Sequence, residues 1–386
     1  MATDHSALVC EADRAVSGGD VAGARRLLEA AAAHSSADID THLRLAAICR
    51  AGGDPAGALA AVEAGLSIDP LHFVALLLRA DLLERAGCPA AGEGYSQALA
   101  QRPDTALPAH LETMVRHAER QRDTHRHAAL EALEAATGPL RSALSPDQAA
   151  RMARFRSNAV HATKRFHSEP TDYHYPGLVE REFHDIGTFD WIERLENATD
   201  VIAAEFAAVT VAERAELVPY IRYPDHRPLR QWKALNNSYD WSAIHLIRNG
   251  TVVQRNARHC PATMALIATL PQPAIDGVSP NAMYSLLAPG AHIPPHVGIA
   301  NTRLVCHLPL VVPEHCWFRV GAERRDWRRG AAWVFDDTIE HEAANESAEL
   351  RVILIVDVWH PGLSAIERAA IAATIAAHGR WAGNGF

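Results

Sequence analysis

Three histidines lie close together in the stretch "HIPPHVGIANTRLVCH", at positions 292, 296 and 307. Imidazole binds transition metals, but it also packs inside proteins as a neutral ring. The residue types alone therefore leave two interpretations open. One is a set of half-buried histidines on a strand, which is the commoner role of a single histidine. The other is a metal site, which needs further ligands from elsewhere in the chain.

A second part of the chain supplies candidates for that site. His341 follows the strand-like run "AAWVFDD", and Arg351 opens the run "RVILIVDVW", which is apolar on both faces. A charge in such a strand is costly unless it meets an anion, and the planar guanidinium fork matches a carboxylate. His296, His341 and Arg351 together favour a site in which two imidazoles hold Fe(II) and the arginine binds the distal carboxylate of 2-oxoglutarate.

Short β-type runs must position these groups, and they occupy the chain from about residue 217 onward. The candidates are "AMYSLLA", "TRLVCHLPLVV", "CWFRVG", "AAWVFDD" and "LRVILIVDVW". Several short strands at near-regular spacing without intervening helices predict an all-β sandwich or barrel, with the last run as a central strand. Period-two alternation places Arg303, Val305 and His307 on one strand face. If His307 points into a pocket, Arg303 does too.

The first part of the chain is helical and repetitive. Gly19, Gly53 and Gly87 recur at a spacing of 34 residues, each between two apolar helical runs. This period resembles the tetratricopeptide repeat, in which small residues such as Ala24 and Ala58 let the helices stack closely. A generic helical bundle is the alternative. We expect the repeats and their connecting helices to fill residues 1–165, a second domain to fill 166–386, and "DWIERLENATDVIAAEFAAV" to form one amphipathic helix.

Composition excludes several other classes of protein. The 386 residues carry a net charge of −9, so no basic stripe suggests nucleic acid as a partner. We find no uncharged apolar run of about 18 residues and no secretory leader, so neither a membrane span nor export is expected. The six cysteines are scattered without a CxxC pair, which is typical of reduced thiols in a cytoplasmic protein.

With these residues in view, roughly positions 170 to 375 resemble the aspartyl/asparaginyl β-hydroxylases. The resemblance is carried by "YPGL", "DWS", "FDD…EHE" and "DVWHP", and tetratricopeptide-type helices also precede the oxygenase domain in that family. It implies an α+β chain of two domains, an all-α solenoid followed by a double-stranded β-helix of the jelly-roll or cupin type. It also implies an Fe(II)- and 2-oxoglutarate-dependent dioxygenase.

The resemblance assigns roles residue by residue. It makes His296 and His341 the iron ligands and leaves to solvent the position of Gly298, where many related oxygenases carry a carboxylate. It makes Arg351 and Ser285 partners of one 2-oxoglutarate carboxylate and sets His307 near the other end of that cosubstrate. Asp336 and Asp337 are expected to cap or brace the turn before His341, although a substitute ligand is the alternative. His292 matches no ligand and is expected at the surface or the pocket rim.

The residues expected to contact the substrate match the family less well than the iron and 2-oxoglutarate residues do. An arginine at the position of Arg303 faces the acidic side chain of the substrate in the family, and Trp241 and Asn236 are further candidate contacts. Trp241 is equally compatible with plain core packing. Two positions depart from the family: Val305 replaces an arginine on the cosubstrate strand, and Asn236 stands where a basic residue helps to bind an aspartyl substrate. The first removes one charge that would hold the 2-oxoglutarate carboxylates, so His307 or Ser285 would have to compensate. The second weakens the case for an aspartyl substrate specifically.

The expected reaction is hydroxylation of the β-carbon of an Asp or Asn residue in a peptide or protein, using O2 and releasing succinate and CO2. The repeats support a peptide substrate, because concave helical stacks bind extended chains. Hydroxylation of a small molecule or a lipid acyl chain with the same cofactors is the first alternative. A non-catalytic repeat scaffold with a decayed oxygenase domain is the second.

Overall fold

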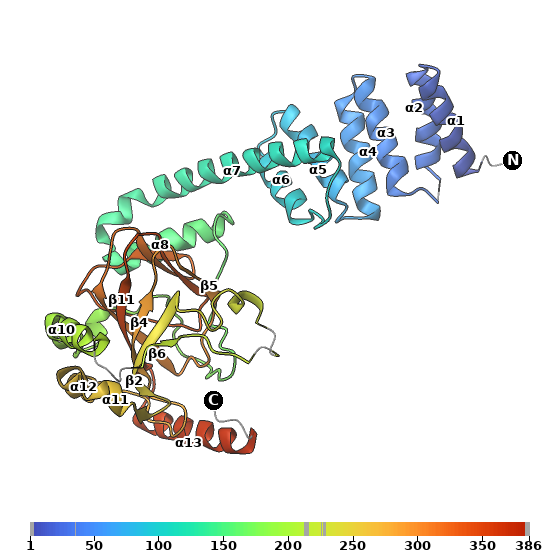
Figure 1. Ribbon diagram of the computed structural model, residues 1–386. Coiled ribbons are helices and arrows are strands. Elements are labelled where there is room, and N and C mark those ends of the chain that lie inside the picture. Colours follow the sequence, from blue (N-terminus) through green and yellow to red (C-terminus); the bar gives the residue numbers. More distant parts are fainter. Residues whose placement is uncertain (1–3, 35, 212–215, 225, 227–228, 383–386) are drawn as a thin grey trace. The chain divides into compact units, whose positions relative to one another are not determined.

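The computed structural model describes residues 4–34, 36–211, 216–224, 226 and 229–382 (Figure 1). The chain separates into two compact units, Met1–Ala162 and Thr163–Phe386. The division lies close to the domain boundary expected after residue 165. None of the helices within the described residues is long and apolar enough to cross a membrane.

The first unit consists of consecutive helical hairpins followed by two further helices. Gly19, Gly53 and Gly87 sit at the corresponding turn of each hairpin with φ of +78°, +75° and +67°, a backbone conformation that glycine adopts without steric cost. Ala24 and Ala58 are fully buried where helices pack. These features fit a tetratricopeptide-like domain. The helices are α1 His5–Ser17, α2 Val21–Ala32, α3 Ile39–Ala51, α4 Pro55–Ile68, α5 Phe73–Arg85, α6 Ala91–Ala100, α7 Ala109–Thr137 and α8 Pro146–Ala159.

The second unit is built on two antiparallel sheets. The larger has the strand order β1-β2-β4-β11-β6-β9, with β3 paired to β2, and the smaller has the order β5-β10-β7-β8. The strands are β1 Val218–Pro219, β2 Trp241–Arg248, β3 Thr251–Val252, β4 Ala282–Leu287, β5 His292–His296, β6 Arg303–Val311, β7 Cys316–Val320, β8 Glu323–Asp326, β9 Trp333–Phe335, β10 His341–Asn345 and β11 Arg351–Trp359.

From β4 onward the chain passes back and forth between these two sheets, which is the connectivity of a double-stranded β-helix, or jelly roll. The predicted fold class is therefore confirmed. The prediction that the run opening at Arg351 is a central strand is also confirmed, because β11 lies between β4 and β6. Strand β11 is buried on both faces and so could be recognised from its continuous apolar run.

Two large cores pack against the sheets of the second unit, beside a smaller cluster that includes Trp359 and Ile371. One fills the space between the sheets and contains Ile293, Phe318 and Ile353. The other lies on the opposite face of the larger sheet, which α10 and α12 cover with Ile202, Phe206 and Ile267. The helices of this unit are α9 Ile192–Asn197, α10 Thr199–Thr210, α11 Gln254–Ala257, α12 Pro261–Ile267 and α13 Ala365–Ala382.

The expectation of one helix through "DWIERLENATDVIAAEFAAV" was wrong. Two helices, α9 and α10, meet at Ala198. The Thr199 hydroxyl donates a hydrogen bond to the Glu196 carbonyl oxygen at 2.5 Å. A threonine that bonds the preceding turn in this way competes with the helical ladder, which accounts for the break.

Candidate active site

A cavity of about 350 Å³ opens between the two sheets of the second unit. Its walls bring together seven of the eight residues that the sequence singled out as site residues, from β2, β4, β5, β6, β10 and β11. They are Trp241, Ser285, His296, Arg303, His307, His341 and Arg351. Asn236 does not line it. Arg303, Val305 and His307 all face this cavity, as the strand alternation predicts.

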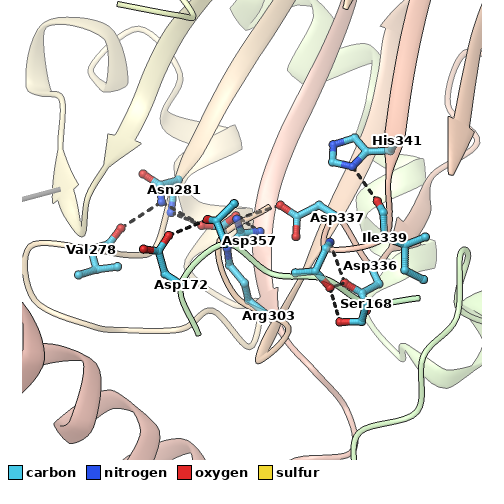
Figure 2. Close-up of polar contacts among 12 residues, drawn as sticks. Ser168, Asp172, Val278, Asn281, Arg303, Asp336, Asp337, Ile339, His341 and Asp357 are labelled. Carbon is cyan, nitrogen blue, oxygen red and sulfur yellow. Dashed lines mark hydrogen bonds and ion pairs between the residues drawn. The ribbon is translucent and has the colours of Figure 1, made fainter. Parts of the chain in front are cut away.

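His296 and His341 are direct neighbours across the β5–β10 strand pair. Their ring centroids lie 4.0 Å apart. In each case Nδ1 lies within hydrogen-bond distance of the carbonyl oxygen two residues earlier, at 2.7 Å to Pro294 and 3.0 Å to Ile339 (the His341 bond is drawn in Figure 2). A carbonyl oxygen can only accept, so Nδ1 carries the proton and Nε2 keeps its lone pair.

Burial keeps both rings neutral. Desolvation, followed by repulsion from His341, lowers the pKa of His296 to about 3. Desolvation likewise lowers the pKa of His341 to about 4. Two neutral imidazoles with backbone-anchored Nδ1 atoms and open Nε2 atoms form the donor arrangement typical of histidine metal ligands. The described residues contain no group of three or more His, Cys, Asp or Glu side chains arranged to hold a metal ion.

One extended segment joins the loops that carry these histidines. The Glu169 amide donates to the Thr338 carbonyl oxygen at 2.8 Å, next to the loop that leads into His341. The Thr171 amide donates to the Gly298 carbonyl oxygen at 3.0 Å, just after His296. The Ser168 and Thr338 hydroxyls are also hydrogen-bonded, at 2.7 Å. Residues 168–171 therefore fix the two loops relative to each other.

Arg351 lies at the inner end of the cavity and is only 1% exposed. Within the described part of the chain it has no carboxylate partner, and its Nε atom has no hydrogen-bond acceptor. Burial lowers the pKa of Arg351 to about 9, so the guanidinium still carries its charge at pH 7. A buried cation without a counter-ion is unfavourable, which makes this end of the cavity a strong candidate for an anion site.

Ser285 complements that arginine. Its Oγ accepts hydrogen bonds from Trp241 Nε1 at 3.1 Å and from Arg351 Nη1 at 3.4 Å. Both lone pairs of the hydroxyl are then occupied, so its own hydrogen is directed to a further acceptor. Trp241 is held in turn by stacking on Tyr220, with ring centroids 3.7 Å apart. The structure thus gives Trp241 a bracing contact to Ser285 in addition to its place in the cavity wall.

His307 lines the same cavity as His296, His341 and Arg351. Its ring packs against Phe335 and Phe318 with centroid distances of 4.7 and 5.1 Å. Nδ1 is buried without a hydrogen-bond partner among the described residues. Desolvation and the nearby Arg351 charge lower the pKa of His307 far below its ordinary value. A neutral ring with an unused polar atom in the cavity wall remains available to a ligand.

Arg303 is paired with two carboxylates of the protein, although its Nη1 forms no hydrogen bond among the described residues. Its guanidinium forms ion pairs with Asp337 at 2.9 Å and Asp357 at 3.6 Å, as Figure 2 shows. Burial alone would lower the pKa of Arg303, but the two carboxylates outweigh it and raise that pKa. Asp357 is anchored by Asn281, whose backbone amide and side-chain amide both donate to it at 3.0 Å. The positive charge expected to face a substrate is therefore already balanced by the protein.

Three other predicted positions are placed outside the ligand-facing wall. The Asn236 side chain accepts a hydrogen bond from the Tyr223 amide at 2.8 Å and donates one to the Tyr223 carbonyl oxygen at 3.0 Å. Both of its polar atoms therefore brace a loop. The prediction of a substrate contact finds no support in this arrangement. Asp336 accepts from the Thr338 amide and hydroxyl and so braces the turn before His341. His292 lies on the outer face, 3.0 Å from Glu342.

Three of the cavity residues that sequence reasoning did not propose bear on the site. Tyr220 and Trp327 had no visible signal, because each lies outside the recognised strand runs and reaches the cavity only through the fold. Asp357 could have been found: it is a carboxylate inside the apolar run "RVILIVDVW". A second buried charge on the strand of Arg351 requires a partner for the same reason as the first, and Arg303 is that partner.

The sequence profile of the aspartyl/asparaginyl beta-hydroxylases matches residues 196–361. The human aspartate beta-hydroxylase domain-containing protein 2 is 40% identical over 144 residues, which cover 36% of this chain and 39% of that protein. The human aspartyl/asparaginyl beta-hydroxylase is 36% identical over 141 residues, 36% of this chain and 18% of the relative. The ornithine lipid ester-linked acyl 2-hydroxylase of Rhizobium tropici is 31% identical over 198 residues, 50% of this chain and 66% of the relative.

The chain thus spans about half or less of the length of the animal relatives that it matches. The matched segment contains His296, His341, Ser285, Arg303 and Arg351. It also covers every strand of the jelly roll. The part of the chain that holds the cavity, residues 196–361, is therefore similar to the aspartyl/asparaginyl β-hydroxylase family.

Proposed function

We propose that the second unit is an Fe(II)- and 2-oxoglutarate-dependent dioxygenase that hydroxylates the β-carbon of an Asp or Asn residue in a peptide or protein. The observation that carries the proposal is the coexistence, in one cavity, of two neutral imidazoles with open Nε2 atoms and a buried arginine without a counter-ion. The similarity to this family supports hydroxylation as the type of reaction.

The residues present fit both cofactors. His296 and His341 would hold Fe(II) through Nε2, since their Nδ1 protons are committed to backbone carbonyls. Arg351 would neutralise the distal carboxylate of 2-oxoglutarate, and the Ser285 hydroxyl would donate to the same group. His307 would border the other end of the cosubstrate. Such a centre, when loaded, supplies O2 activation coupled to conversion of 2-oxoglutarate into succinate and CO2.

The protein's own contribution is orientation and exclusion of water. The segment 168–171 sets the spacing of the two histidine loops. The Tyr220–Trp241 stack holds Ser285 toward the arginine. Buried aromatic walls around His307 restrict water at the inner end of the cavity. We place the target carbon on the side of the cavity that Arg303, Tyr220 and Ile299 line.

The charge balance around Arg303 indicates whether a charged or an uncharged substrate group fits there. Arg303 is paired with two aspartates, and Val305 supplies no charge. Asn236 is used on the backbone of Tyr223. An uncharged group therefore meets less electrostatic mismatch than a carboxylate, which within the peptide proposal favours asparagine over aspartate.

The same observation favours a second candidate, hydroxylation of a lipid acyl chain. Val297, Ile299, Met283 and Ile355 present aliphatic surface to the cavity, and such walls suit a hydrocarbon segment. One relative of comparable similarity is named as an acyl 2-hydroxylase. The two candidates differ in the substrate and share the metal site, the cosubstrate and the jelly roll.

The repeat unit gives the peptide proposal its second support. Stacked helical hairpins commonly bind extended chains, so we include a peptide or protein as the partner of this unit. If that is correct, a peptide that extends well beyond the hydroxylated residue binds the full chain more tightly than a short one. Equal affinities would remove the repeats from substrate binding.

The test begins with anaerobic binding of Fe(II) and 2-oxoglutarate to the full chain, followed by succinate release on admitting O2. His341→Ala, His296→Ala and Arg351→Ala should abolish succinate formation. His292→Ala is the matched control, because its ring lies on the outer face of the same strand as His296. Absence of iron and 2-oxoglutarate binding by the intact protein would reject the oxygenase and favour a non-catalytic scaffold.

The same reactions identify the substrate class. Peptides matched except for a central Asp or Asn, and a micellar acyl lipid, are offered to the loaded enzyme and analysed by mass. A gain of one oxygen on the Asn peptide supports the first candidate, and the same gain on an acyl chain supports the second.

A further inference from the structure

Trp327 contacts the arginine at the inner end of the cavity. The guanidinium carbon of Arg351 lies 4.9 Å from the centre of the Trp327 ring. Trp327 follows β8 of the smaller sheet, whereas Arg351 opens β11 of the larger one. The contact therefore spans the space between the sheets. Both side chains line the cavity.

Trp327 is itself held rigidly. Its ring stacks on Phe318 with centroids 5.4 Å apart and planes at 28°, and on Trp333 at 5.9 Å and 20°. The side chain is 4% exposed. Phe318 and Trp333 also contact each other at 6.2 Å, so the three rings form one packed cluster, and Trp327 is the ring that contacts the guanidinium. A large aromatic side chain with two rotatable bonds and such neighbours provides a fixed surface.

Arg351 needs such a surface because little else fixes it. Its one hydrogen bond to a described side chain is the 3.4 Å contact with Ser285, and Nε has no acceptor. An arginine side chain has high rotamer freedom. Stacking on an indole occupies one face of the guanidinium and leaves its edge, where the N–H groups point, open to a planar carboxylate.

We propose that Trp327 is a positioning residue for the distal carboxylate of a 2-oxo dicarboxylate: it orients Arg351 by stacking so that the guanidinium edge meets that carboxylate. This inference rests on the proposed function, since it assumes that the cavity takes 2-oxoglutarate. It assigns Trp327 to the arginine end of the cosubstrate and gives it no part in holding the metal.

The test compares two ligands that both chelate the metal, of which only one has a distal carboxylate. Oxalate offers the metal a chelating pair of carboxylate oxygens but has no distal carboxylate, whereas 2-oxoglutarate engages both the metal and Arg351. Affinities of the Mn(II)-loaded full chain for each are measured by anaerobic titration calorimetry. Trp327→Leu should bind 2-oxoglutarate about ten- to thirty-fold more weakly, as expected for loss of a desolvated cation–π contact, and bind oxalate as the wild type does.

Two further variants separate positioning from folding. Trp327→Phe keeps an aromatic face and loses the indole N–H, so it should retain 2-oxoglutarate affinity within about threefold. Trp317→Leu is the matched control: Trp317 also stacks on an arginine, Arg324, at 4.2 Å. It lies on the outside of the same sheet, where its Nε1 donates to Glu346, and its loss should change neither affinity.

Wild-type 2-oxoglutarate affinity in Trp327→Leu overturns the inference, and so does an equal loss of oxalate and 2-oxoglutarate. A Trp327→Phe variant as weak as Trp327→Leu overturns the stacking role. Failure of the wild-type protein to bind 2-oxoglutarate, with oxalate still bound, would instead reject the proposed function itself. The two failures are therefore distinguishable.

Discussion

The carboxylate of Asp337 fills the space that a side chain at position 298 would need. A β-carbon built on Gly298 would lie 2.2 Å from Asp337 Oδ2, far inside van der Waals contact. The Gly298 amide also donates to the Asp337 carbonyl oxygen at 2.7 Å. The lack of a carboxylate two residues after His296 thus has a local packing reason, because the space belongs to a partner of Arg303.

Gly298→Ala should therefore destabilise the second unit by about 1–3 kcal/mol, the usual cost of overpacking. The added methyl group must push Asp337 away from Arg303. The measurement is denaturant unfolding followed by tryptophan fluorescence, since all eight tryptophans lie after Ala162. Gly187→Ala is the control, because its added atom meets Asp185 at an ordinary 3.4 Å.

A double-mutant cycle tests the cause of that loss. If Asp337 is the obstacle, Gly298→Ala combined with Asp337→Ala costs less than the sum of the two single substitutions. Strict additivity would mean that the alanine at 298 clashes elsewhere.

Ser285→Ala should weaken 2-oxoglutarate binding about tenfold or more, the scale of a hydrogen bond to a charged group. Its hydroxyl accepts from Trp241 and Arg351 and so has a hydrogen left for a carboxylate. Metal affinity should not change, because Ser285 is not a ligand. Ser242→Ala, a buried serine on β2 outside the cavity wall, should leave both affinities intact; an equal effect at Ser242 would point to packing.

Strands with a continuous apolar pattern or a regular apolar–polar alternation could be predicted from the sequence. Strand β11 and the face shared by Arg303 and His307 follow from local periodicity alone. His296 and His341 could be proposed as a pair from residue type and from their place at strand ends. The two strands that carry them, β5 and β10, are short and polar, so hydrophobic pattern gave no boundary for either.

The rest depends on contacts between segments distant along the chain. Asp337, Asp357 and Arg303 come from three different parts of the sequence, and only the sheet register brings them together. The resemblance to known hydroxylases suggested a substrate-facing Arg303 because it transfers residue types but not ion-pair partners. The amide of Asn236 bonds the backbone of Tyr223, a contact that residue type alone does not predict.

Replacing Arg303 should be among the more damaging changes in the second unit. Arg303→Met leaves Asp337 and Asp357 as buried carboxylates without their cation, which costs about 3–5 kcal/mol. Adding Asp357→Asn to that variant should recover part of the lost stability. Arg329→Met, which breaks an exposed pair with Asp200, should cost at most about 1 kcal/mol. Denaturant unfolding measures all three, and a loss at Arg303 no larger than at Arg329 would contradict the buried network.

Acid should destabilise the second unit through His184. Burial, followed by repulsion from His360 and Arg181, lowers the pKa of His184 to about 3, and its Nε2 has no partner among the described atoms. Above pH 6.5 the ring is neutral in both the folded and the unfolded chain. As the pH falls below 6.5, only the unfolded chain takes up the proton, so stability is lost, by about 2 kcal/mol at pH 5.

His184→Phe should remove this contribution, because phenylalanine fills a similar volume and does not titrate. The free energy of unfolding would then fall by about 2 kcal/mol less between pH 7 and pH 5 than it does in the wild type. His174→Phe, at an exposed histidine, should leave the wild-type pH dependence in place. An unchanged pH dependence in His184→Phe would show that the buried ring is protonated without unfolding. The acid sensitivity would then have to come from other buried histidines such as His245. Burial lowers the pKa of His245 to about 4.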